Sequence, residues 1–194
     1  MALADNSQAN LTVALQVNGN AAVNGAATVT GILTAGGHQV NGNATFTGTL
    51  TAADVILPAA DCAEEFEIGS AAEAEPGTVM VLDEAGVLQP SSQPYDKKVA
   101  GVISGAGSYR PGIILDRGKS SPTRQPVALL GKVFCKVDAQ YGPVEIGDML
   151  TTSPTGGHAM KASDRSLAFG AVIGKALQRL AEGRGLIPML IALQ

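Results

Sequence analysis

The stretch Val17-Asn18-Gly19-Asn20-Ala21-Ala22-Val23-Asn24-Gly25-Ala26-Ala27-Thr28-Val29-Thr30-Gly31 repeats an apolar residue, a small polar residue and a glycine every six residues. The pattern returns at Val40-Asn41-Gly42 and Phe46-Thr47-Gly48. In a stack of short strands joined by tight corners, the apolar side chain fills the axis and glycine adopts the positive φ of the corner. We therefore expect a β-helical shaft over residues 11–57, with the axial side chains Val17, Val23, Val29, Val40 and Phe46.

The composition of the repeat indicates how many chains the shaft needs. Residues 6–53 contain no Asp, Glu, Lys or Arg, and Thr, Asn, Ala and Gly dominate. Ordering six backbone residues costs more free energy than burying one or two apolar side chains returns. Three copies around one axis give each apolar side chain two symmetry mates and pair every strand edge. We expect a homotrimer. The alternative, a single-chain hexapeptide solenoid, needs more repeats and a capping element.

Charge and composition exclude several kinds of partner. The net charge is −4, from 13 Lys and Arg against 17 Asp and Glu, so the sequence offers no basic patch for nucleic acid. No apolar run is long enough for membrane insertion. Residues 1–6 have neither a basic segment nor an apolar run, so we expect synthesis in the cytoplasm without a signal peptide. Two cysteines, Cys62 and Cys135, are too few for a disulfide framework.

The second half of the chain contains an internal duplication. Residues 77–104 align without a gap on residues 147–174, and each copy reads as a strand, a turn and a second strand. A long strand at 126–137, with a bulge expected at Gly131, separates the copies. Return strands follow at 112–115 and 186–192, and a short helix is expected at 177–182. These patterns predict an all-β protein with four parts: an N-terminal attachment segment 1–10, the shaft 11–57, a linker 58–76, and a compact β-barrel or sandwich domain 77–194.

Few residues in this domain are candidates for chemistry. Its acid and base groups near glycines are Glu145, Asp148, His158 and Asp164. They are more simply strand and turn residues, and a lone histidine does not make a metal site. We therefore expect no catalytic residue, no metal and no cofactor. Two loops carry the concentrated polar residues that are candidates for surface recognition, with a solvated loop as the plain alternative: Tyr109, Arg110, Arg117 and Lys119.

The repeat resembles the trimeric β-helical shafts of phage tail fibres and related contractile injection machines, in which Val-x-Gly runs recur. The second half resembles the C-terminal β-domain that follows such shafts in phage appendage proteins, known in some relatives as an autoproteolytic intramolecular chaperone. Residues 99–104, 126–133, 146–153 and 158–162 carry this resemblance. It implies a domain that brings three chains into register before the shaft forms.

Together these observations predict a non-enzymatic structural subunit of a fibre or spike on a phage tail or phage-like contractile injection particle. The resemblance implies attachment to a baseplate or tail protein at the N-terminus, and a working position on the extracellular side of the assembled virion or machine. The C-terminal domain is expected to trimerise and cap the shaft. Two alternatives stay open: a chaperone domain that cleaves its own chain between residues 54 and 70, and a receptor-binding tip that recognises a cell surface.

Overall fold

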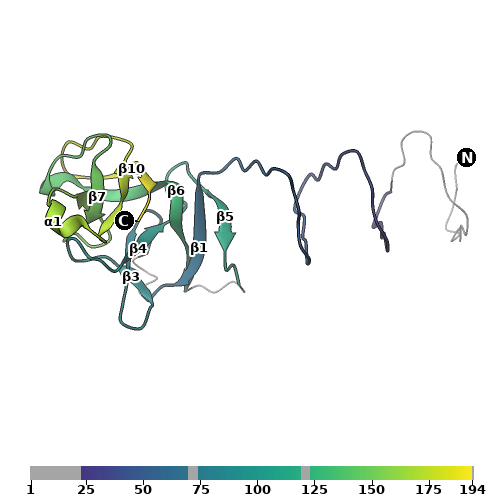
Figure 1. The fold of residues 1–194 in the computed structure, drawn as a ribbon, viewed down its shortest axis with the longest axis horizontal. Coiled ribbons are helices and arrows are strands. Elements are labelled where there is room, and N and C mark those ends of the chain that lie inside the picture. The colour runs from purple at the N-terminus through teal and green to yellow at the C-terminus, as the bar shows by residue number, and fades with distance from the viewer. Residues whose placement is uncertain (1–22, 70–73, 119–122, 194) are drawn as a thin grey trace, which may run out of the picture. The chain divides into compact units, whose positions relative to one another are not determined.

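The structure is a computed structural model that describes residues 23–69, 74–118 and 123–193. The chain divides into two units, Met1–Ala52 and Ala53–Gln194. Within the first unit, residues 23–52 form neither strands nor helices (Figure 1). The single chain therefore does not show the β-helical strands expected of the shaft. The attachment segment 1–10 and the axial residue Val17 lie outside the described residues.

The second unit is almost entirely β-structure. It contains one short α-helix, α1, and one turn of 3-10 helix, η1, among the described residues. The elements are β1 Asp61–Glu67, β2 Val79–Leu82, β3 Leu88–Pro90, β4 Val99–Ile103, β5 Pro111–Leu115, β6 Arg124–Asp138, η1 Ala139–Tyr141, β7 Met149–Thr152, β8 Ala159–Lys161, α1 Arg165–Ala168, β9 Val172–Ala176 and β10 Arg184–Ile191.

The second half of this unit is a closed five-stranded barrel. Its strands follow the order β10, β9, β7, β8 and β6. The barrel closes because β10 also pairs with β6, from Gly131 opposite Ile191 to Asp138 opposite Arg184. The pairing of β8 with β6 is parallel and joins Val137 to Ala159. Most of the large apolar core lies in this barrel.

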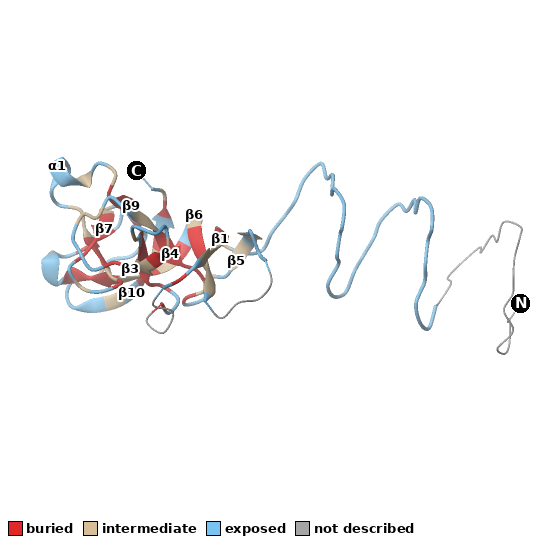
Figure 2. Ribbon diagram, turned by 90° about the horizontal axis from the view of Figure 1, so that it is seen from below, coloured by how far each residue is buried: buried red, intermediate tan, exposed pale blue. Residues whose placement is uncertain are grey.

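The first half repeats this arrangement. Strand β1 pairs with the N-terminal half of β6, β6 with β4, β4 with β2, and β2 with β3. A parallel bridge between Ile68 and Leu88 closes the ring, in the place of the contact between Val137 and Ala159 in the second barrel. Strand β6 therefore belongs to both barrels, and β5 is an additional strand that pairs with β1. Figure 2 shows the buried residues gathered inside this paired structure.

The equivalence of the two barrels extends to their cores. The residue numbers of equivalent positions differ by 70 between β2 and β7, by 71 between β3 and β8, and by 73 between β4 and β9. With these offsets, and with the two matching parallel bridges, the core residues of the first barrel paired below correspond to residues in the core of the second. The pairs are Ile68 with Val137, Met80 with Leu150, Leu88 with Ala159, and Ile103 with Ala176. The duplication thus includes three inserted residues that a gap-free alignment does not contain.

Several local predictions were wrong. The expected linker 58–76 contains β1, a full member of the first barrel. Residues 177–182 are not helical, because Leu180 forms a backbone bridge with Val144. The register shift in β6 lies near Leu129 rather than at Gly131, since Cys62 faces Leu130 whereas the next residue faces Ala128. The expected return strand at 112–115 pairs with β1 and is not the counterpart of β10.

Candidate functional site

The apolar repeat positions of the first unit are exposed in the single chain. Val23 is 65 % exposed, Val29 54 %, Val40 57 % and Phe46 62 %. Monomeric proteins rarely leave so many large apolar side chains at regular intervals in solvent. Within the part of the chain that the structure describes, these side chains therefore stay largely unpacked.

The loop before β5 was expected to present Tyr109 and Arg110 as recognition residues. Instead, the guanidinium of Arg110 turns back and donates to the carbonyls of Gly105 at 2.8 Å and Gly107 at 3.0 Å. The ring of Tyr109 packs against Phe134, with the ring centroids 4.9 Å apart. Both residues thus contribute to the structure of the loop, with Tyr109 half-buried and Arg110 still exposed.

The second recognition loop follows β5. Arg117 forms an ion pair with Glu65 at 3.5 Å, and its side chain remains 69 % exposed. Lys119 lies outside the described residues. Arg124, at the start of β6, donates to the Asp116 carboxylate and to the Glu65 carbonyl, both at 2.6 Å. These contacts join the loop to β1, and Arg117 is the predicted recognition residue here that stays largely exposed.

The four acid and base candidates lie in the second barrel and serve local structure. Asp148 forms an ion pair with Lys161 at 2.8 Å and accepts a hydrogen bond from the backbone N–H of Glu145. Asp164 caps α1 by accepting from the N–H of Ser166 at 2.8 Å. His158 places its Nδ1 2.7 Å from the carbonyl of Gly156. None of these contacts joins a nucleophile to a base in the manner that general base catalysis requires.

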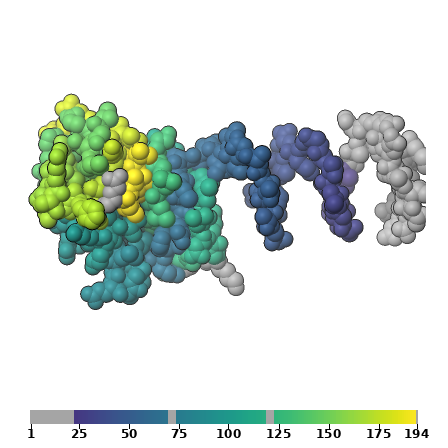
Figure 3. Space-filling view, viewed as in Figure 1, coloured from purple at the N-terminus to yellow at the C-terminus, as the bar shows by residue number. Residues whose placement is uncertain are grey.

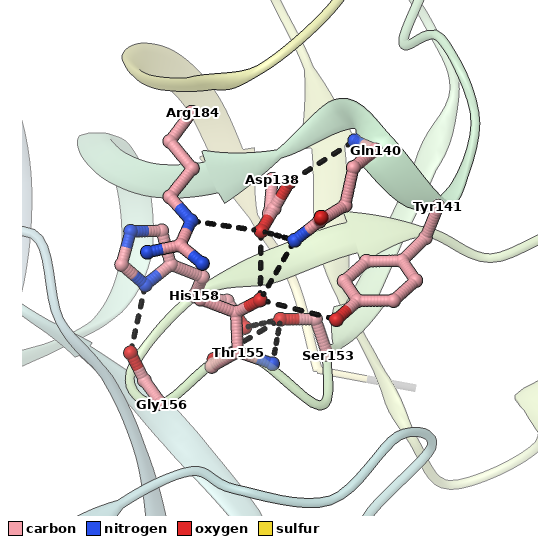
Figure 4. Close-up of polar contacts among 8 residues, drawn as sticks. All are labelled: Asp138, Gln140, Tyr141, Ser153, Thr155, Gly156, His158 and Arg184. Carbon is pink, nitrogen blue, oxygen red and sulfur yellow. Dashed lines mark hydrogen bonds and ion pairs between the residues drawn. The ribbon is translucent and has the colours of Figure 1, made fainter.

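A polar cluster around Asp138 was not expected from the sequence (Figure 4). The Asp138 carboxylate, at the end of β6, is 0 % exposed and accepts from the Oγ1 of Thr155 at 2.7 Å. It also accepts from the backbone N–H of Gln140 at 3.0 Å and from Nε of Arg184 at 3.1 Å. Ser153 donates its hydroxyl to the carbonyl of His158 at 2.9 Å. Aspartate directly before a helical turn is an N-cap signal, which was the available clue.

The Asp138 cluster stabilises the negative charge of the Asp138 carboxylate. Burial opposes ionisation, but hydrogen bonds from Thr155, Gln140 and Arg184 outweigh that cost and lower the pKa of Asp138. The hydroxyl of Ser153 and the ring of His158 each bond to backbone carbonyls, so neither activates the other. The cluster therefore fixes η1, β10 and the turn between β7 and β8 to one another.

The remaining reactive groups are sparse. Burial raises the pKa of the Cys135 thiol to about 12, so this cysteine stays protonated at neutral pH. Cys62 is a half-buried free thiol on β1. Across residues 23–69, 74–118 and 123–193 we find no group of three residues suited to hold a metal ion. The helices in the same ranges are too short to cross a lipid bilayer.

A cavity of about 750 Å³ opens beside β7. Its walls come from the start of β7, the end of β8, and α1 with the residues that follow it. They combine apolar side chains, including Phe169 at 86 % exposure, with the two cations Lys161 and Arg165. The full lining is Gly147, Asp148, Met149, Lys161, Ala162, Arg165, Ala168, Phe169 and Val172. Neither Arg165 nor Phe169 carried a sequence signal.

Comparison with known proteins places the fold. No protein-family profile and no curated protein matches the chain. The solved structure of the pre-mature bacteriophage phi29 gene product 12 matches with a TM-score of 0.54 and 16 % identity, and it covers 75 % of this chain and 24 % of that one. The C-terminal fragment of the same gene product matches with a TM-score of 0.46 and 17 % identity over 68 % of this chain and 100 % of the fragment.

A third structure, the N base of the phi29 head fibre gp8.5, has a TM-score of 0.33 and 16 % identity, covering 71 % of this chain and 93 % of that chain. Of the three, the first exceeds a TM-score of 0.5, and it shows a shared fold. The chain spans about a quarter of the length of that phage protein. The expected resemblance to phage proteins is thus confirmed at the level of fold, while the β-helix and the chaperone activity stay predictions.

Proposed function

We propose that the chain is a structural subunit of a phage particle, a homotrimeric fibre or spike. In this proposal, residues 11–57 of three chains wind into a β-helical shaft, and the double barrel caps it and brings the chains together. The N-terminal segment would attach to a baseplate or tail protein, on the outer side of a virion or phage-like injection machine. The shared fold with a phage gene product supports the proposal. The six-residue sequence repeat supports the part of it that concerns the shaft.

The observation that carries the proposal is the exposure of the repeat. Val23, Val29, Val40 and Phe46 are each more than half exposed, and residues 23–52 pair with no strand. A side chain of this size gains about 1.5–3 kcal/mol when it is fully buried. A threefold assembly would bury such a side chain at every repeat in each of the three chains. It would also pair the backbone of each chain with that of its neighbours.

Light scattering on the purified full chain tests the proposal directly. The expected result is a mass three times that of the monomer, with a circular dichroism signal for β-structure beyond that of the barrels alone. A monomeric mass across the concentration range would refute the trimer and the shaft together.

The two alternatives have their own measurements. A self-cleaving chaperone predicts fragments that part between Ala52 and Ser70 in an intact-mass spectrum, whereas we expect one species of full mass. A receptor-binding tip predicts that binding to cells falls when Tyr109 and Arg117 are replaced by alanine. Arg110 is poorly suited to such a test because it also holds its own loop.

A further inference from the structure

The two barrels of one chain meet through a backbone contact. The turn between β7 and β8 reaches the first barrel, where Gly157 accepts from the N–H of Val79 at 2.9 Å and donates to the carbonyl of Ser91 at 2.7 Å. The carbonyl of Thr152, just before this turn, accepts from the N–H of Tyr95 at 3.3 Å. The first barrel thus has a binding surface for a turn of the second.

The second barrel has the same surface, and no described residue of the second unit occupies it. By the offsets above, Val79 corresponds to Met149 and Ser91 to Ala162. The carbonyl of Met149 accepts from Ala162 N–H at 2.8 Å, just as that of Val79 accepts from Ser91 N–H at 2.9 Å. Yet this is the site of the 750 Å³ cavity, and Met149 is half-buried where its counterpart Val79, which contacts Gly157, is buried.

The matching turn of the first barrel is likewise not bound by any other described part of the second unit. It runs over residues 83–87 between β2 and β3 and projects from the second unit (Figures 1 and 3). Gly86 has φ +78° and corresponds to Gly157, which has φ +67°. Gly86 is exposed, whereas Gly157 is buried in the contact between the barrels. Each barrel therefore has one surface and one turn, and one of each is unused.

The unused turn and the unused cavity are complementary in charge and polarity. The turn carries the acidic residue Glu84 at its exposed tip and the apolar Leu82, 37 % exposed, at its base. The cation Arg165 and the exposed ring of Phe169 both line the cavity. Opposite charges at a contact of this kind favour encounter in one orientation.

We propose that the cavity beside β7 binds the 83–87 turn of a second copy of this chain. Gly86 of the second copy takes the place that Gly157 occupies on the first barrel, with its carbonyl facing Met149 N–H. Its own N–H, which donates to the Asp83 carbonyl at 3.2 Å in the single chain, turns to the Ala162 carbonyl in the contact. Glu84 of the second copy then faces Arg165. Such a head-to-tail contact closes into a ring when its rotation allows, which suits the trimer on which this inference rests.

Disulfide trapping in the full chain tests the contact. With Cys62→Ser as background, Ala85→Cys places a thiol on the turn and Ala168→Cys places one in the cavity wall. Mild oxidation is expected to link chains covalently up to the trimer on a non-reducing gel. The matched control keeps Ala85→Cys and moves the second thiol to the exposed Ala181, outside the cavity, where interchain bands are expected to be weak.

Charge reversal provides the second measurement. Glu84→Lys or Arg165→Glu alone is expected to lower the yield of the cross-link by about two- to fivefold, as for one partly exposed ion pair. Both changes in one chain should restore it. A light-scattering trimer that gives no more cross-link than the control would overturn this contact and leave the proposed fibre intact. A monomeric wild-type chain would overturn both.

Discussion

The buried carboxylate of Asp138 offers the sharpest test of what holds the second barrel together. Replacing it with alanine removes the acceptor shared by Thr155, Gln140 and Arg184. A hydrogen bond to a charged group contributes about 1.5–3 kcal/mol. Arg184 is 61 % exposed and regains water, so two bonds, those from Thr155 and the N–H of Gln140, make up most of the loss. We expect Asp138→Ala to lower the free energy of unfolding by about 3–5 kcal/mol.

Urea unfolding followed by tyrosine fluorescence suits this measurement. The chain has no Trp, and its three tyrosines, Tyr95, Tyr109 and Tyr141, all lie in the second unit. The matched control is Glu145→Ala, which removes an ion pair to Arg179 between two largely exposed side chains. Such a pair contributes about 0–1 kcal/mol. If the two variants lose equal stability, the Asp138 cluster does not hold the barrel as we argue.

The pH dependence gives an independent check on Asp138. Its pKa is lower in the folded state than the ordinary value of 3.8. The charge therefore stabilises the fold above pH 3.8, and this contribution is lost as the pH falls through the folded pKa. The difference in stability between wild type and Asp138→Asn should be largest near neutrality and shrink below pH 3.8. A difference that is constant from pH 7 to pH 3 would contradict the role of the charge.

Three further changes have definite expected outcomes. Burial raises the pKa of Asp61, so the charged carboxylate lowers the stability of the fold at pH values above the folded pKa. Asp61→Asn should therefore raise the urea midpoint at pH 7 and raise it less at pH 4. A Cβ on Gly174 would lie 2.1 Å from the carbonyl oxygen of Leu190, so Gly174→Ala should lower the thermal midpoint strongly, whereas Gly156→Ala, with its nearest atom at 4.0 Å, should not. Val23→Asp should prevent shaft assembly, because three unpaired carboxylates would meet on the axis; trimers of wild-type mass by light scattering would show that Val23 faces outward.

The duplication was visible in the sequence because β2 and β7 keep the offset of 70 residues. The gap-free alignment nevertheless matched β4 to the wrong residues of the second copy, and the reason can be identified. The turn after β7 is one residue longer than the turn after β2, and the segment that contains α1 is two residues longer than its counterpart. Val99 therefore corresponds to Val172 and not to Phe169. Two small insertions in connecting segments change no pattern of hydrophobicity, so a single sequence does not reveal them.

The double role of β6 could not be predicted from local patterns. The sequence indicates one long strand, yet its N-terminal half takes in the first barrel the place that β10 takes in the second. Its C-terminal half takes the place of β1. Which strand pairs with which is decided by contacts between residues far apart in the chain. Strand β1 was missed because its place in the sheet also depends on distant contacts. Its acidic sequence, Asp61-Cys62-Ala63-Glu64-Glu65-Phe66-Glu67, is typical of a linker.

For the candidate site, residue composition predicted recognition residues that the fold uses elsewhere, and it missed residues that line the cavity. Arg110 and Tyr109 have the composition of recognition residues, but the fold uses them to close their own loop. Arg165 and Phe169 had no sequence signal, because their interest comes from the cavity that the fold forms beside β7. Composition can indicate which side chains are able to bind. The fold decides which of them still have a free surface.

A six-residue repeat cannot set its own register. In the proposed trimer, a chain that slid by one repeat would place Val23 where Val29 belongs and would recover almost every apolar contact on the axis, so the correct and the shifted trimers would differ little in free energy. A contact outside the repeat must distinguish them. A turn of one copy seated in a cavity of the next has a single position, because glycine, charge and backbone partners match only there. On the proposed assembly, the double barrel would thus supply the specificity that the shaft lacks.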